Sequence, residues 1–155
     1  MSELTDQVAG AFASEYRMRA ADLHKWADPL SEEQFWRNPY AYGNSVGHLV
    51  LHLTGNLSYY LGARVANSGY VRNRNLEFTE SRRPPKADVL RKFDEAIALV
   101  IATIEKQSET DWTLPYSAEG VPEARNRFTV FLRCAAHLHH HVGQINYLAR
   151  EVTKK

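Results

Sequence analysis

The chain has 155 residues, with 19 Lys and Arg against 18 Asp and Glu, and a formal net charge of +1. This length fits one domain, and the nearly balanced charge argues against a general binder of nucleic acids or anionic membranes, which would need a surplus of basic residues. Cys134 is the only cysteine, so no intrachain disulfide is possible. The N-terminus lacks the pattern of a secretory signal, and no apolar run is long enough for a membrane span. We therefore expect one cytoplasmic domain over residues 1–155.

The first predicted helix runs from about residue 3 to residue 26, and its apolar side consists of Leu4, Val8, Phe12, Leu23 and Trp26. The segment DPLSEEQFWRNPYAYGN interrupts this pattern, and Ser31 and Gln34 within it have the spacing of a capping box, which predicts one short helical turn. The second helix should begin at Asn44 or Ser45, since either residue is a competent N-cap. It should end around residues 67–69, where Asn and Gly suit a C-terminal cap.

A third helix is predicted after Pro84 and Pro85, and a fourth from about Arg127 to Val152. The two connections before these helices are long for a bundle, and connections beyond about 12–15 residues are often functional. The first of them is basic, which suits either an anionic ligand or a solvated surface. Four amphipathic helices without strands predict an all-α fold, a four-helix up-and-down bundle, in which metal sites are built from facing helices.

The fourth predicted helix contains four histidines within the run HLHHH. On a helical wheel, with about 100° per residue, His137 and His141 lie toward the apolar side, whereas His139 and His140 point toward water or a partner. Residues four apart stand one turn apart on the same face, so His137 and His141 can both ligate one ion. Hydrogen-bonded core histidines are the alternative interpretation.

The second helix offers two further histidines. The wheel places His52 at a flank that a facing helix can approach and His48 almost opposite the apolar centre, so we choose His52. Three imidazoles leave coordination positions open, as in catalytic sites, and they suit Zn, Ni, Fe or Cu better than Ca. Cys134 is a candidate fourth ligand, although a buried cysteine is usually a small hydrophobic residue.

Three segments resemble those of a known family. HLHHHVGQINYL and NSVGHLVLHLTGN are similar to the last-helix and second-helix motifs of the DinB/YfiT-like superfamily of four-helix metalloproteins, and VRNRNLEF resembles a loop found in one subgroup. The resemblance covers nearly the whole chain and implies a metal site made of His52, His137 and His141. These are the histidines that the wheels select.

The resemblance also implies a function. Relatives use a divalent transition metal, such as Zn, Ni or Fe, to activate a low-molecular-weight thiol toward an electrophile, so we expect a thiol S-transferase, and a homodimer. Its partners would then be a small-molecule thiol and an electrophile, with no nucleic acid and no membrane. The alternatives are a catalytically silent, stress-related metal-binding bundle and a metal-dependent hydrolase that activates water.

Two polar residues stand near the predicted ligands. Asn56 lies one turn after His52, and Gln144 lies three residues after His141, so each can orient an imidazole or contact a substrate. An ordinary interhelical or surface hydrogen bond is the alternative for both. Tyr59 and Tyr60 either line a pocket or pack in the core. We assign no general base, because the sequence alone places no carboxylate near the metal.

Overall fold

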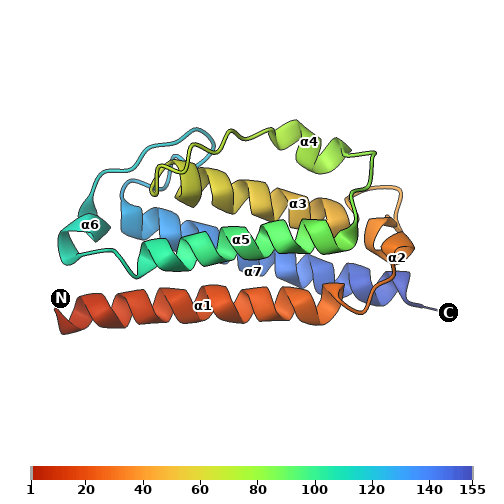
Figure 1. Cartoon of the computed structure of the whole chain (residues 1–155), viewed down its shortest axis with the longest axis horizontal. Coiled ribbons are helices and arrows are strands. Elements are labelled where there is room, and N and C mark those ends of the chain that lie inside the picture. Colours follow the sequence, from red (N-terminus) through yellow and green to blue (C-terminus); the bar gives the residue numbers. More distant parts are fainter. Residues whose placement is uncertain (1, 155) are drawn as a thin grey trace.

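The computed structural model describes residues 2–154 and folds them into a bundle of helices (Figure 1). Four long helices lie side by side: α1 (Glu3–Ala27), α3 (Val46–Leu57), α5 (Lys86–Ile104) and α7 (Arg127–Val152). Shorter elements connect them, namely α2 (Glu32–Trp36), the π-helix η1 (Ser58–Ala63), α4 (Arg74–Thr79) and α6 (Glu109–Thr113). The predicted all-α four-helix bundle is confirmed, since residues 2–154 contain no strand.

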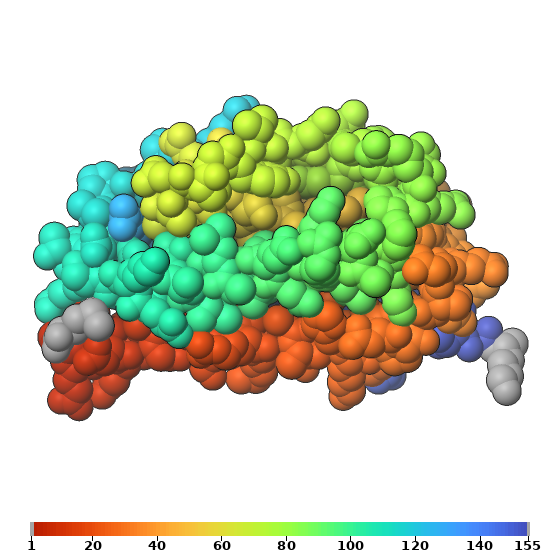
Figure 2. Space-filling model, viewed as in Figure 1, coloured from red at the N-terminus to blue at the C-terminus, as the bar shows by residue number. Residues whose placement is uncertain are grey.

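The long helices do not simply alternate in direction. Figure 1 shows α1 and α7 running one way along the bundle and α3 and α5 running the other way. Because α3 and α5 are parallel, the chain between them, residues 64–85, must travel back along the whole bundle. This return explains why the connection is long, and it carries α4 over α3. Figure 2 shows the same segment covering much of α3 on one face of the molecule.

The core lies where the four long helices meet. Its largest fully buried side chains come from all four long helices, from α2 and from η1: Tyr16, Leu23, Phe35, Val46, Leu53, Leu57, Leu61, Phe93, Ile104, Phe131, Leu138 and Ile145. Each such side chain contributes about 1.5–3 kcal/mol when it is fully buried. Tyr16 donates its buried hydroxyl to the carbonyl of Phe131 at 2.8 Å, so the phenol is not left without a partner.

Side-chain caps fix where several helices begin. Ser45 caps α3 by accepting a hydrogen bond from the amide of His48, and the predicted capping box of Ser31 and Gln34 is confirmed at α2. None of the helices within residues 2–154 is long and apolar enough to cross a membrane.

The second predicted helix differs from expectation at its end. We expected one helix to residues 67–69, but α3 ends at Leu57 and continues as the π-helix η1 to Ala63. A π-helix carries more residues per turn, so the side chains after it face other directions than an α-helix would give them. Asn67 and Gly69 adopt positive φ angles of 54° and 76° beyond the helix end, where the chain turns back.

Candidate metal centre

Three histidine side chains meet between α3 and α7. One ring nitrogen each from His52, His137 and His141 lies within 4.8 Å of the others. Nε2 of His137 is 3.2 Å from Nε2 of His52 and 3.1 Å from Nε2 of His141. Two imidazole nitrogens bound to one tetrahedral zinc at its usual bond length would be about 3.3 Å apart. The spacing of the three nitrogens therefore fits a shared metal ion.

The remaining histidines of both helices lie outside this cluster. His139 and His140 are exposed, as the helical wheel predicts. The wheel is wrong about His48, which is half-buried instead of pointing to solvent. Its Nδ1 is 2.7 Å from the Ser45 hydroxyl and its Nε2 is 3.0 Å from the carbonyl of Glu80, because the returning chain covers that side of α3.

A buried carboxylate holds His52 in place. Nδ1 of His52 donates to Oε2 of Glu77 at 2.9 Å, and both side chains are only 6% exposed. Because Nδ1 carries the proton, the lone pair of Nε2 is free to face the other two histidines. Arg72 donates two hydrogen bonds to the same carboxylate, from Nε to Oε1 at 2.7 Å and from Nη2 to Oε2 at 2.8 Å.

This arrangement keeps Glu77 ionised. Burial alone would raise the pKa of Glu77, but the hydrogen bonds from Arg72 and His52 outweigh burial and lower it. On its way to His52, the Glu77 carboxylate occupies the space that a side chain at residue 55 would need. A Cβ atom at Gly55 would lie 2.0 Å from Oε1 of Glu77.

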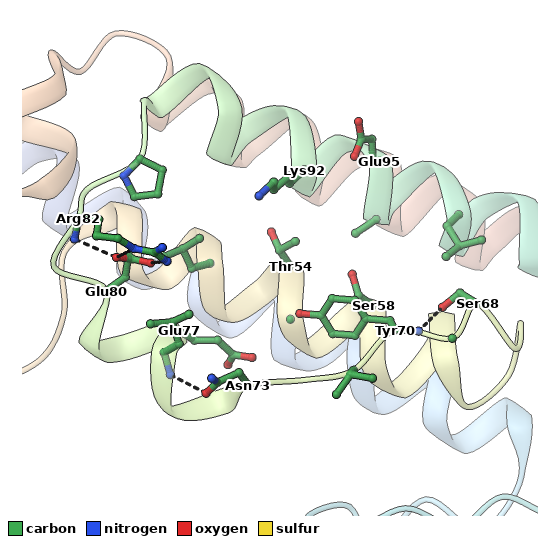
Figure 3. Close-up of a pocket in the computed structure, with 18 residues that line it drawn as sticks. Thr54, Ser58, Ser68, Tyr70, Asn73, Glu77, Glu80, Arg82, Lys92 and Glu95 are labelled. Carbon is green, nitrogen blue, oxygen red and sulfur yellow. Dashed lines mark hydrogen bonds and ion pairs between the residues drawn. The ribbon is translucent and has the colours of Figure 1, made fainter.

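Sequence reasoning missed both Glu77 and Arg72. They lie in VRNRNLEF, which resembled a family loop, but no role followed from that resemblance. Glu77 belongs to α4, and Figure 3 shows α4 lying against α3 with the Glu77 side chain directed between the two helices. That placement depends on the course of the returning connection, which residue spacing does not reveal.

The predicted orienting residues differ in what they contact. Nδ1 of His141 lies 2.7 Å from Oε1 of Gln144, which can accept a hydrogen bond from Nδ1–H and leave the lone pair of Nε2 free. Asn56 is buried, and its Oδ1 has no hydrogen-bond partner.

Cys134 is fully buried but is not among the three clustered ligands, and burial raises the pKa of its thiol to about 12. These features favour the interpretation of Cys134 as a hydrophobic core residue.

Two of the histidines resist protonation. Burial, together with the neighbouring imidazoles of His141 and His52, lowers the pKa of His137 to about 2. The pKa of His141 is lowered to about 4, mainly by burial, although the hydrogen bond that His141 donates to Gln144 opposes the shift. Both rings are thus neutral at pH 7, and neutral imidazole is the form that binds metals.

A cavity of about 850 Å³ opens beside the histidines. Besides the three histidines and Asn56, it is lined by Tyr59 and Tyr60 from η1 and by Arg133 from α7, so the two tyrosines do line a pocket. A second cavity of about 660 Å³ lies between α3, α4 and α5 (Figure 3). Among the described residues, the one cluster of three metal-binding side chains borders the first cavity, and we place the candidate site there.

Comparison with known proteins identifies one family. The model of the DinB superfamily matches residues 15–145, a segment that contains all three clustered histidines together with Arg72 and Glu77. No curated protein and no solved structure gives a significant match.

Proposed function

This chain belongs to the DinB superfamily, and we propose that it is a divalent-metal-dependent enzyme that transfers a low-molecular-weight thiol to an electrophile. The convergence of three imidazole nitrogens beside a large cavity is the observation that carries the proposal. Three protein ligands leave at least one coordination position open, which a structural metal site does not do.

The protein side chains have two roles, which are to bind the metal and to orient the rings that bind it. His52, His137 and His141 would hold a divalent transition ion such as Zn, Ni or Fe. When bound, such an ion lowers the pKa of a coordinating thiol, so that the nucleophilic thiolate exists at neutral pH. Glu77 and Gln144 fix the ring orientations of His52 and His141, so little reorganisation is needed when the ion enters.

The contacts of Glu77 favour a thiol over water as the activated group. Metal-dependent hydrolases usually pair the ion with a carboxylate that takes a proton from water. Glu77 is the carboxylate that contacts one of the three histidines, and it already accepts hydrogen bonds from both Arg72 and His52. A free thiol has a pKa of about 8.5 against about 15.7 for water, so it needs less help to ionise.

The first test is metal content. We expect purified protein to bind about one zinc per chain and His52→Ala, His137→Ala and His141→Ala each to lose most of it. His139→Ala and His140→Ala are matched controls on the same helix and should keep the metal. Equal loss from all five variants, measured by elemental analysis, would contradict the assignment.

The second test is turnover with a thiol and a model alkylating electrophile. We expect thiol consumption that requires metal and disappears in His137→Ala. Turnover that proceeds without thiol would support the hydrolase alternative. Bound metal without turnover in any assay would support the silent metal-binding alternative.

A further inference from the structure

Residues that carry buried polar atoms without partners gather at the wall of the cavity beside the histidines. Within residues 2–154, six buried side-chain nitrogen or oxygen atoms have no hydrogen-bond partner. Three of the six belong to residues that line this one cavity, namely Asn56 Oδ1, Arg133 Nη1 and His137 Nδ1. Unpaired buried polar groups are costly in a folded protein. Their concentration here indicates a site built for a polar ligand.

Arg133 has the largest unused bonding capacity of the three. Its Nε donates to Oε1 of Glu123 at 3.2 Å, but the Glu123 side chain is 58% exposed, so water screens this ion pair. The guanidinium carbon lies 5.7 Å from the centre of the Tyr60 ring, which supports the group at the cavity wall. The Arg133 side chain keeps 26% of its surface exposed, so an anion in the cavity can reach it.

The charge of the residues that line the cavity also favours an anionic ligand. Arg72, Arg74 and Arg133 line the cavity, against the single carboxylate of Glu119. Arg72 is committed to Glu77 by two hydrogen bonds. The remaining positive charge makes the cavity favourable for an anion, and the planar fork of a guanidinium matches a carboxylate.

The position of Arg133 links it to the metal centre. Arg133 precedes His137 by four residues on α7, so the two side chains leave the same face of the helix one turn apart, about 5–6 Å between their Cβ atoms. A small molecule with a thiol and a carboxylate a few bonds apart can therefore reach both groups at once.

We propose that the substrate of this site is an anionic thiol whose carboxylate binds Arg133 while its sulfur faces the three histidines. Arg133 is then a residue that sets specificity, and Asn56 is placed to meet another polar group of the same substrate. This inference rests on the proposed function, because it names the substrate class of that site.

The test compares two thiols of nearly equal shape. Zinc-loaded protein is titrated by calorimetry with 3-mercaptopropionate and with its neutral amide, 3-mercaptopropanamide. We expect wild-type protein to bind the acid at least about tenfold more tightly, as one charge-assisted hydrogen-bonded pair provides. Arg133→Gln should remove this preference while keeping zinc content and affinity for the amide. Arg133→Lys should keep part of the preference.

Arg17→Gln is the matched control, because it makes the same charge change on α1, where Arg17 pairs with Glu105. It should bind both thiols as the wild type does. Equal binding of acid and amide by the wild type, or an unchanged preference in Arg133→Gln, would overturn the inference alone. Wild-type protein that binds no zinc, or neither thiol, would instead overturn the proposed function.

Discussion

Glu77 connects the three histidines to the surrounding protein. It accepts hydrogen bonds from His52 and Arg72 in a site where both His52 and Glu77 are 6% exposed. A buried ion pair of this kind is a weak source of stability but a strong constraint on geometry, because removing one partner leaves the other charge buried and unpaired.

We predict that Glu77→Gln lowers zinc affinity by about 10–100-fold, because His52 loses the charged acceptor that fixes its tautomer. Metal competition titrations measure the change. The exposed Glu95, which pairs with Arg91, provides the control variant Glu95→Gln, whose affinity should match the wild type. Arg72→Met combined with Glu77→Gln removes both buried charges and should recover thermal stability without recovering zinc affinity. Wild-type affinity in Glu77→Gln would show that the carboxylate does not position His52.

At the residue scale, the helical wheels select the three histidines that cluster, but they do not give the surroundings of the α3 histidines. The angles around α7 place His137 and His141 together because helix geometry is local. The environment of His48 and the presence of Glu77 depend on how α4 and its flanking loops pack on α3, and no periodicity within α3 contains that information.

The close approach of α4 to α3 depends on Gly55. We predict that Gly55→Ala weakens zinc binding at least about tenfold, since its Cβ would lie 2.0 Å from Glu77 and force the carboxylate away from His52. Gly10→Ala on α1 is the control. No atom lies within 4 Å of a Cβ at Gly10, so the change should stabilise the exposed helix by about 0.5–1 kcal/mol. Unchanged zinc affinity in Gly55→Ala would contradict this account of the α3–α4 contact.

A charged histidine joins α1 to α5. Nδ1 and Nε2 of His24 lie 2.8 Å from Asp28 and 2.7 Å from Asp94, and both nitrogens can donate only when the ring is protonated. Burial alone would lower the pKa of His24, but the hydrogen bonds and charges of Asp94 and Asp28 outweigh it and raise the pKa above 6.5. The stabilisation is therefore complete below about pH 6.5, the unfolded value, and is lost as the pH rises through the raised folded value.

We predict that His24→Gln lowers the free energy of unfolding more at about pH 6 than at about pH 8.5. The difference should be on the order of 1 kcal/mol or less, because solvent reaches the three side chains. Urea unfolding of both proteins at the two pH values measures it, and titrations elsewhere in the chain cancel in the comparison. An equal loss at both pH values would mean that His24 stabilises without its proton.

At the scale of elements, the helix positions follow from the sequence better than their connections do. α7 spans the predicted residues 127–152 because a long amphipathic pattern begins at the cap Asn126. The parallel directions of α3 and α5, the π-helix after Leu57 and the short helix α4 result from packing between segments distant in sequence. Local propensity does not contain these features.

For the whole molecule, zinc should act as a crosslink between α3 and α7. We predict that zinc at about 100 times its Kd stabilises the folded protein by about 2.7 kcal/mol. For a chain of this length, that corresponds to a rise in Tm of roughly 5–11 °C. Thermal unfolding of metal-free protein with and without zinc measures the shift. His137→Ala should show little rise, and an equal rise in both proteins would place the bound zinc elsewhere.

The distance along the chain between His52 and His137, 85 residues, also bears on biosynthesis. A nascent polypeptide still lacking its last helix would present one imidazole of the three, since the other two enter with α7. All three imidazoles can therefore share a metal ion only after α7 has been synthesised, and we predict that ribosome-bound chains truncated before residue 127 do not retain zinc there.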